Sequence, residues 1–284
     1  MSNLNIPVKP ARNFVPENIN WDEWSEVEPL LEDLANRELS SLDSLKKWLQ
    51  DRSEMEAVVA ENVGRRYIAM TVDTTDDEAA KSYEFFVTQI NPKVSPYDDK
   101  LNRKLNDCPY KNELTDSGYK IFFRGVASAI EIYRDENNEL AAKDAQLGQQ
   151  YGAVSGKQAI TYKGEEITMQ KAGTFLKSTE REVRKEVFEL VATRRLQDAE
   201  EMDKILTEMV EIRTEMGKNA DFENYRDYKF KSMGRFDYSV QDCFNFHESI
   251  EKEIVPIVKT FTQERMDKLG FGELKPYDLS LIHI

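Results

Sequence analysis

Apolar side chains recur every three or four residues along most of this 284-residue chain. That spacing places them on one face of an α-helix, so it predicts a succession of amphipathic helices. Glycine and proline number only 12 and 9, and this scarcity also favours helices over many short strands. Residues 1–20 lack the pattern and contain Pro7, Pro10 and Pro16. They predict an extended arm that packs on the helices that follow.

Local signals divide the first half of the chain into expected helices. Proline is favoured at a first helical position, and a Ser or Thr followed three residues later by an acid satisfies free amides at a helix start. The dipeptide Asn91-Pro92 is expected to stop the helix before it. Further helices are expected over residues 97–107 and 115–134. The expected starts are Pro29, Ser53 with Glu56, and Thr75 with Glu78.

The second half of the chain continues the helical pattern after one interruption. Residues 159–168 alternate around Lys163-Gly164 and predict a β-hairpin. The segment 197–201 has little apolar content between two periodic helices, which suggests a domain boundary near residue 198. The remaining signals are helix starts at Thr179 with Glu182 and at Ser239 with Asp242, a C-terminal cap at Gly217, and a bend at Pro256.

Charge and cysteine usage exclude several classes of protein. Asp and Glu outnumber Lys and Arg by 53 to 39, which gives a net charge of −14. Such a surface repels phosphate backbones, so no nucleic-acid partner is expected. No apolar run approaches the roughly 18 residues of a membrane span, and the N-terminus lacks a signal-peptide pattern. Cys108 and Cys243 are the only cysteines. We therefore expect a cytoplasmic protein with reduced thiols and no membrane partner.

Histidine offers the first candidate for chemistry, in the pattern His247-Glu248-Ser-Ile-Glu251. A zinc peptidase helix needs His-Glu-x-x-His, because two imidazoles one turn apart point at one metal and the Glu activates its water. Here Glu251 replaces the second histidine. Cys243 lies one turn before His247, but two ligands alone do not hold a structural zinc. We interpret His247 as a histidine on a helix surface.

Three other patterns also have simpler interpretations. Residues 152–157 resemble a phosphate-binding loop, but the glycine spacing is too short and Gln158 follows the lysine, so we expect a turn into the hairpin. The acidic segment 72–78 lacks calcium-loop spacing and is expected to cap a helix. Aromatic and basic residues alternate over 225–236. They could stack on single-stranded nucleic acid, but in so acidic a chain we expect them to pack a helix–turn connection.

The order of several motifs carries more information than any single one. Their most specific member runs from Phe222 to Tyr238 and reads Phe-Glu-Asn-Tyr-Arg-Asp-Tyr-Lys-Phe-Lys-Ser-Met-Gly-Arg-Phe-Asp-Tyr. The other motifs, in chain order, are Trp21…Trp24…Pro29-Leu30-Leu31, Tyr67…Val72-Asp73-Thr74, Phe85-Phe86…Ile90-Asn91-Pro92, Tyr151-Gly152, the hairpin from Ile160 to Thr168, and Ser178-Thr179-Glu180-Arg181-Glu182-Val183-Arg184.

Together these motifs resemble the N-terminal half of an M3-family oligoendopeptidase of the oligoendopeptidase F type, up to Lys275-Pro276-Tyr277-Asp278. The resemblance implies a mostly α fold: a multi-helix N-terminal domain over residues 1–198 with one small β-hairpin, then the first helices of a zincin-type catalytic domain over 199–278. It also implies a peptidase that cuts short peptides with Zn²⁺ bound by His-Glu-x-x-His and a later Glu.

No residue of this chain matches those zinc-binding motifs, so we assign no catalytic, metal-binding or cofactor-binding position. Residues 279–284 read like a translated sequencing adaptor, and we expect them to be a non-native tail. The resemblance thus implies a truncated zinc metalloendopeptidase, and we expect this chain to bind no zinc and to be inactive alone. The alternative is a complete, non-catalytic helical module that binds peptides or a protein.

Overall fold

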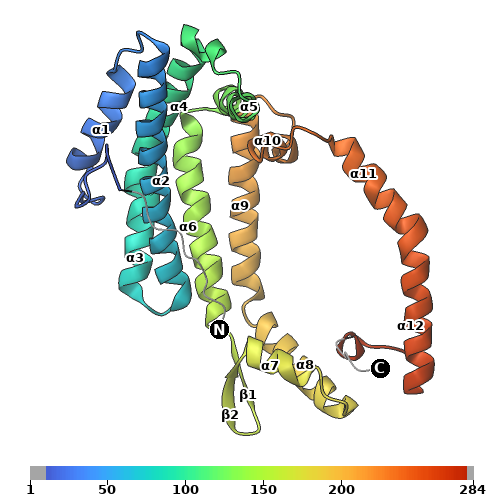
Figure 1. Ribbon diagram of the computed structural model, residues 1–284. Helices are drawn as coiled ribbons and strands as arrows, with labels where there is room; N and C mark the ends of the chain where they lie inside the picture. Colours follow the sequence, from blue (N-terminus) through green and yellow to red (C-terminus); the bar gives the residue numbers. More distant parts are fainter. Residues whose placement is uncertain (1–10, 280–284) are drawn as a thin grey trace. The chain divides into compact units, whose positions relative to one another are not determined.

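The computed structural model describes residues 11–279, which are mostly helical with a two-stranded sheet (Figure 1). The predicted mostly α fold class is confirmed. Two compact units are formed, the first by residues up to 146 with 212–234, and the second by 147–211 with the residues from 235 onward. The elements are α1 (Trp24–Asn36), α2 (Leu42–Val72), α3 (Asp77–Phe85), α4 (Asn91–Asp107), α5 (Ser117–Ile132), α6 (Glu136–Gly156), β1 (Ala159–Tyr162), β2 (Glu165–Thr168), α7 (Met169–Phe175), α8 (Arg181–Leu196), α9 (Ala199–Asn219), α10 (Tyr225–Ser232), α11 (Val240–Ser249) and α12 (Val255–Leu269).

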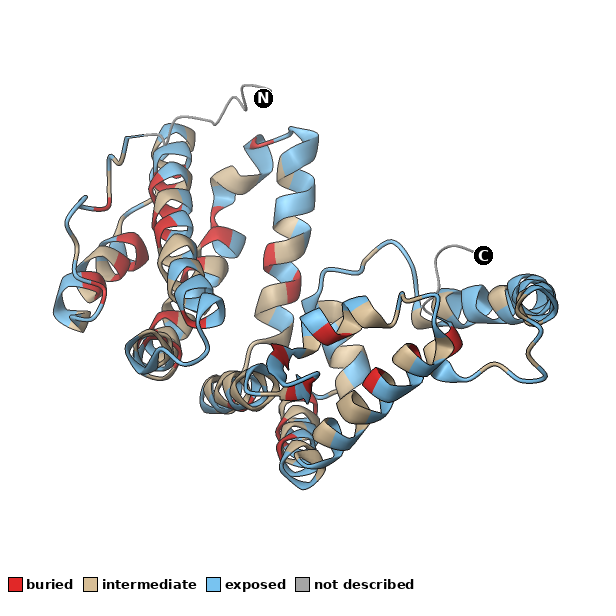
Figure 2. Ribbon diagram, turned by 90° about the horizontal axis from the view of Figure 1, so that it is seen from below, coloured by how far each residue is buried: buried red, intermediate tan, exposed pale blue. Residues whose placement is uncertain are grey.

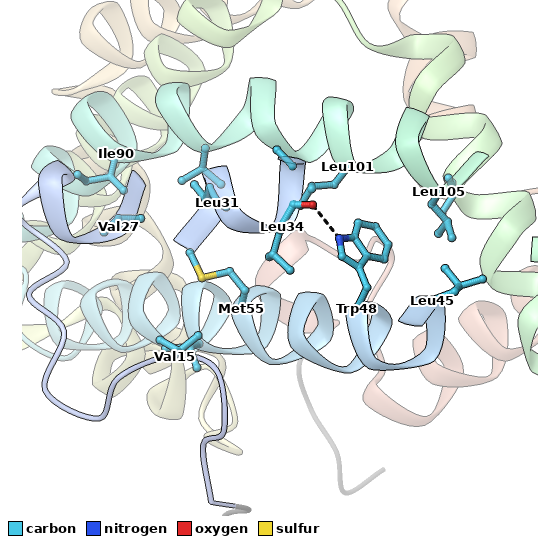
Figure 3. Close-up of a cluster of buried hydrophobic side chains, with 14 of the residues drawn as sticks. Val15, Val27, Leu31, Leu34, Leu45, Trp48, Met55, Ile90, Leu101 and Leu105 are labelled. Carbon is cyan, nitrogen blue, oxygen red and sulfur yellow. Dashed lines mark hydrogen bonds between the residues drawn. The ribbon is translucent and has the colours of Figure 1, made fainter. Parts of the chain in front are cut away.

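The core of the first unit lies between α1, α2 and α4 (Figure 3). Trp48 is its largest fully buried side chain, and its indole N–H donates to the Leu34 carbonyl at 2.8 Å. That carbonyl belongs to the last turn of α1, where no intrahelical N–H is available. Lys104 of α4 donates to the Ala35 carbonyl at 2.9 Å. The end of α1 is therefore satisfied by side chains from both neighbouring helices.

Helix α2 is continuous through Ser53, so the predicted start at Ser53 and Glu56 is wrong. Its cap is Ser41, which accepts from the Ser44 amide at 3.1 Å. Glu56 instead accepts from the Arg52 guanidinium at 2.7 Å within the helix. The buried residues on both sides of Ser53 occupy one helix face, so an unbroken helix buries them all.

Two predictions that rest on proline are also wrong. Helix α1 begins at Trp24 and contains Pro29 inside it, because the buried Val27 extends the apolar face upstream of the proline. Asn91-Pro92 does not stop a helix. A π-helical turn over Phe86–Ile90 leads directly into α4, where proline near the first position loses no intrahelical hydrogen bond. Phe86 and Ile90 are buried on this turn.

The later start and stop signals have mixed outcomes. Ser239 and Asp242 form the predicted capping box of α11, and a π-helical turn over Ile250–Ile254 precedes Pro256 in α12. Three other predictions are wrong. The cap of α3 is Asp76 rather than Thr75, α8 begins after Glu180 without a side-chain cap, and residues 152–156 belong to α6 rather than to a turn.

Gly217 lies inside α9, so it is not the predicted C-terminal cap. A Cβ at this position would lie 3.2 Å from the Tyr225 Cα. Glycine is therefore needed for the close approach of α9 to the start of α10. The chain reverses afterwards at Asp221, whose φ of 64° is left-handed.

The predicted hairpin is confirmed, with Ile160 opposite Ile167 in an antiparallel pair. Lys163 and Gly164 have φ values of 53° and 84°, the left-handed pair that a two-residue type I′ turn requires. Ile160, Tyr162 and Ile167 form a small core with α7 and α8 in the second unit.

The described part of the predicted arm, residues 11–20, contains bends and a turn but no helix or strand, and Glu54 holds it on α2. The Glu54 carboxylate accepts from the amides of Asn13 at 2.9 Å, Phe14 at 2.8 Å and Val15 at 2.8 Å. Burial alone would raise the pKa of Glu54, but these three hydrogen bonds lower it below its usual value. Val15 is buried beside it. Residues 1–10 of the arm lie outside the described part of the chain.

Replacing Glu54 with glutamine is expected to cost about 1–3 kcal/mol of local stability, because a neutral amide is a weaker acceptor for three amides. Hydrogen exchange of the Asn13, Phe14 and Val15 amides measures the change. Asp43→Asn, at an exposed position of α2, is the control. Since the folded pKa of Glu54 is lowered, its contribution is complete above about pH 4.3 and is lost as the pH falls through the folded value. Unchanged exchange in Glu54→Gln would contradict this role.

Candidate functional site

The residues of the histidine pattern lie on α11 and, in the case of Glu251, on the π-helical turn after it, but they do not converge. His247 is exposed, and its ring centroid lies 6.4 Å from that of the neighbouring Phe246. Glu248 forms a 3.5 Å ion pair with Lys252, and Cys243 is a half-buried free thiol. Among residues 11–279, no group of three or more His, Cys, Asp and Glu side chains is arranged to hold a metal ion.

The acidic segment 72–78 is used for capping, as predicted. Asp76 accepts from the amides of Glu78 and Ala79 at 3.0 Å each and begins α3. Asp73 accepts from the Thr75 hydroxyl at 2.7 Å, and the hydrogen bonds from Thr75 lower the pKa of Asp73. The carboxylates of Asp73 and Asp76 therefore accept local hydrogen bonds at the start of α3.

Two aromatic residues of segment 225–236, Tyr225 and Tyr228, pack the connection between α9 and α10, in agreement with the packing interpretation. The Tyr228 ring lies 5.8 Å from the Phe222 ring and 5.8 Å from the Tyr225 ring. Burial raises the pKa of both tyrosines. Lys231 pairs with Glu131 of α5. The rings of Phe222, Tyr225 and Tyr228 thus pack together within the first unit.

A buried ion-pair cluster that the sequence did not reveal joins α8 to residues 275–278. We call Arg181, Arg184 and Asp278 the clasp. Asp278 is completely buried and accepts from Arg181 at 2.7 Å, from Arg184 at 2.8 Å and from the Lys275 amide at 2.9 Å. Burial would raise the pKa of Asp278, but hydrogen bonds from Arg181, the Lys275 amide and Arg184 lower it to about 2.

The second arginine of the clasp is itself almost inaccessible, with 1% of its surface exposed. Besides Asp278, Arg184 donates to the carbonyls of Tyr277 at 2.9 Å and Ser178 at 2.9 Å. Arg181 stacks on the Phe271 ring at 4.0 Å. In the sequence, Arg184 and Asp278 belong to separate motifs, and their pairing spans more than ninety residues.

Helices α11 and α12 and the π-helical turn between them contain no buried residue (Figure 2). Phe246, Ile254, Ile257 and Phe261 recur at helical spacing, and 49–64% of each residue's surface is exposed. We call this stripe, with Val255 and Val258, the α11–α12 apolar face. Exposed apolar stripes of this length mark surfaces that bind another protein segment.

Two family models match the sequence of this chain. The peptidase M3 N-terminal domain matches residues 14–133, and peptidase family M3 matches residues 174–281. Together the two matches cover most of the chain. The chain belongs to peptidase family M3. The second match includes α8, the clasp and the α11–α12 apolar face.

Solved structures share the fold of this M3 chain. A crystal structure assigned as oligoendopeptidase F from Bacillus anthracis str. Ames has a TM-score of 0.87 at 23% identity, over 95% of this chain and 50% of that one. The structure of Pz peptidase A with inhibitor 2 has a TM-score of 0.88 at 21% identity, over 95% of this chain and 48% of that one. The structure of oligoendopeptidase-F from Enterococcus faecium has a TM-score of 0.70 at 12% identity, over 91% of this chain and 54% of that one.

This M3 chain therefore spans about half the length of the solved structures that it matches. No curated protein is similar enough in sequence to match it. Within residues 11–279, no helix is long and apolar enough to cross a membrane.

Proposed function

We propose that the chain is the N-terminal part of a cytoplasmic zinc metalloendopeptidase that hydrolyses short peptides, and that it is inactive alone. Membership of family M3 supports peptide hydrolysis as the activity of the parent protein. The similarity to oligoendopeptidase structures, which extend to about twice the length, supports a parent with a further half. In this proposal residues 1–198 form the N-terminal domain and 199–278 begin the catalytic domain.

The observation that carries the proposal is the α11–α12 apolar face. Phe246, Ile254 and Phe261 would be expected to lie against other apolar groups in a finished domain, because burying an aromatic or aliphatic side chain contributes roughly 1.5–3 kcal/mol. We infer that the half of the M3 fold missing from this chain covers them. The chain would then form one wall of the peptide groove and limit the size of substrates.

The described residues do not form a zinc site. The pattern at residues 247–251 lacks its second histidine, and no other set of potential ligands converges within residues 11–279. No bond-breaking step can therefore be assigned to these side chains. In the proposed parent, Zn²⁺ and the Glu that activates its water would come from outside the described residues.

Determining the reading frame of the source gene beyond codon 278 tests the proposal. We expect a continuation that encodes His-Glu-x-x-His and a later Glu, and chelator-sensitive peptide cleavage by the longer protein. Leu279 is the only residue of the expected tail 279–284 that the structure describes, and the others lie outside it. A natural stop codon after Ile284 would contradict the proposal and favour the non-catalytic binding module.

The apolar face also predicts self-association of the chain. We expect the purified protein to form concentration-dependent oligomers by light scattering, because the exposed stripe can bury its surface only against another copy. The double variant Ile257→Lys with Phe261→Lys is expected to be monodisperse with unchanged helical circular dichroism. The control places lysines at the exposed polar positions Gln263 and Glu264 of α12. A monodisperse wild-type chain would contradict this prediction.

A further inference from the structure

One edge of the β-hairpin in the second unit is open. Tyr162 and Glu165 flank the two-residue turn, so they bond to each other across the hairpin. Hydrogen bonding alternates along a strand, and Thr161 and Ala159 therefore direct their N–H and C=O groups away from β2. Within residues 11–279, no backbone group pairs with these outward groups.

The two edges of the hairpin differ in how they are protected. Natural sheets discourage unwanted strand addition by placing charges on their edges. β2 carries two exposed charges, Glu165 and Glu166, whereas no residue of β1 is charged. The edge of β1 is thus left accessible to a partner strand.

A groove with a volume of about 490 Å³ runs between this edge and α8. Its size lies within the range of sites that bind small ligands and short peptides. Ala159 and Thr161 line one wall. The other wall is the face of α8 that carries Glu182, Glu186 and Glu189, which are spaced at one-turn intervals.

The groove is acidic. No ion pair engages Glu182, Glu186 or Glu189 among the residues that the structure describes. Lys185 offsets one of these charges. Arg194, at one end of the groove, is neutralised by Asp198 at 2.6 Å, and Gln158 fixes the same carboxylate at 2.8 Å. The chemistry of the groove therefore favours a cationic ligand with an extended backbone.

We propose that an extended peptide segment rich in Lys or Arg binds in this groove as a third strand beside β1. Its backbone pairs with the outward groups of Ala159 and Thr161, and its basic side chains face the three glutamates of α8. Main-chain pairing supplies affinity and the glutamates supply selectivity, as in other cases of strand addition. The site needs neither zinc nor cleavage, so it is testable whether or not the proposed peptidase function holds.

Fluorescence anisotropy of the full chain with a labelled Val-Lys-Val-Lys-Val peptide amide tests the proposal. We expect a dissociation constant on the order of 100 μM that weakens as salt is added. The peptide Val-Glu-Val-Glu-Val is expected not to bind. Thr161→Pro removes the outward N–H without touching the bonds to β2, and it is expected to weaken binding about tenfold.

The matched control is Glu166→Pro, which makes the same change at the residue opposite Thr161, on the other edge of the hairpin. We expect this variant to bind the lysine peptide as the wild type does. The double variant Glu186→Lys with Glu189→Lys is expected to abolish binding. N-methylation of alternate peptide amides supplies a test that needs no protein variant, and it is expected to weaken binding about tenfold. Absence of binding to the wild type, equal weakening by Glu166→Pro, or unaltered binding of the N-methylated peptide would overturn the proposal.

Discussion

Replacing Asp278 with alanine is expected to lower the free energy of unfolding of the second unit by about 3–5 kcal/mol, because it leaves the buried Arg184 without its counter-charge. Arg184 would keep its bonds to the Tyr277 and Ser178 carbonyls, which cannot neutralise a guanidinium. Residues 275–278 would then lose their attachment to α8. The effect is expected to be confined to the second unit, because all three partners of the clasp lie there.

Two spectroscopic signals distinguish the unfolding of the two units in urea. All three tryptophans, Trp21, Trp24 and Trp48, lie in the first unit, so their fluorescence reports on that unit. Asp278→Ala should therefore shift part of the circular dichroism transition to lower urea and leave the fluorescence transition in place. Asp203→Ala, at an exposed position of α9, serves as the control and should change stability by less than about 0.5 kcal/mol. Equal behaviour of the two variants would contradict the account of the clasp.

The clasp also predicts how stability depends on pH. The pKa of Asp278 is lowered to about 2 in the folded chain, whereas an unfolded aspartate titrates near 3.9. A lowered folded pKa means that the stabilisation is complete above the unfolded value and is lost as the pH falls from about 4 towards 2. Urea unfolding followed by circular dichroism measures the free energy of unfolding across this pH range. As the pH falls, this free energy should decrease more steeply in the wild type than in Asp278→Asn.

Replacing Trp48 with alanine is expected to destabilise the first unit by about 3–5 kcal/mol, the cost of a large cavity in a packed core. The variant also leaves the Leu34 carbonyl at the end of α1 without its indole donor. Trp48→Phe retains most of the apolar contact and loses the donor, so it is expected to cost about 1–3 kcal/mol. The difference between the two variants separates packing from the hydrogen bond.

Urea unfolding of the first unit, followed by the fluorescence of Trp21 and Trp24, measures both variants. Trp48 is absent from each of them, so the remaining signals can be compared directly. Leu49→Ala on the half-buried side of the same helix is the control and should cost less than Trp48→Ala. A smaller loss in Trp48→Ala than in Leu49→Ala would show that Trp48 is not central to the core.

Local sequence patterns predicted the elements whose causes are local. The hairpin follows from alternation around Lys163-Gly164, and α11 begins at the predicted box of Ser239 and Asp242. The same patterns failed where an apolar face continued through a signal. Ser53 and Pro29 both lie inside helices, because burial of the flanking residues outweighs a local preference.

The features that bear on function depend on contacts between distant residues. Nothing near Asp278 in the sequence indicates a partner on α8, because the pairing exists only once the second unit has folded. The residues of the α11–α12 apolar face follow a helical spacing in the sequence, but the sequence does not indicate that they are exposed. The groove beside β1 likewise requires the hairpin and α8 to be placed together.

The most direct test of the central claim is hydrolysis of a fluorescence-quenched peptide by the purified 284-residue chain, with and without a zinc chelator. The account predicts no turnover in either condition and no stoichiometric zinc by elemental analysis. Turnover that the chelator abolishes would contradict it, because the chain would then contain a complete metallopeptidase site.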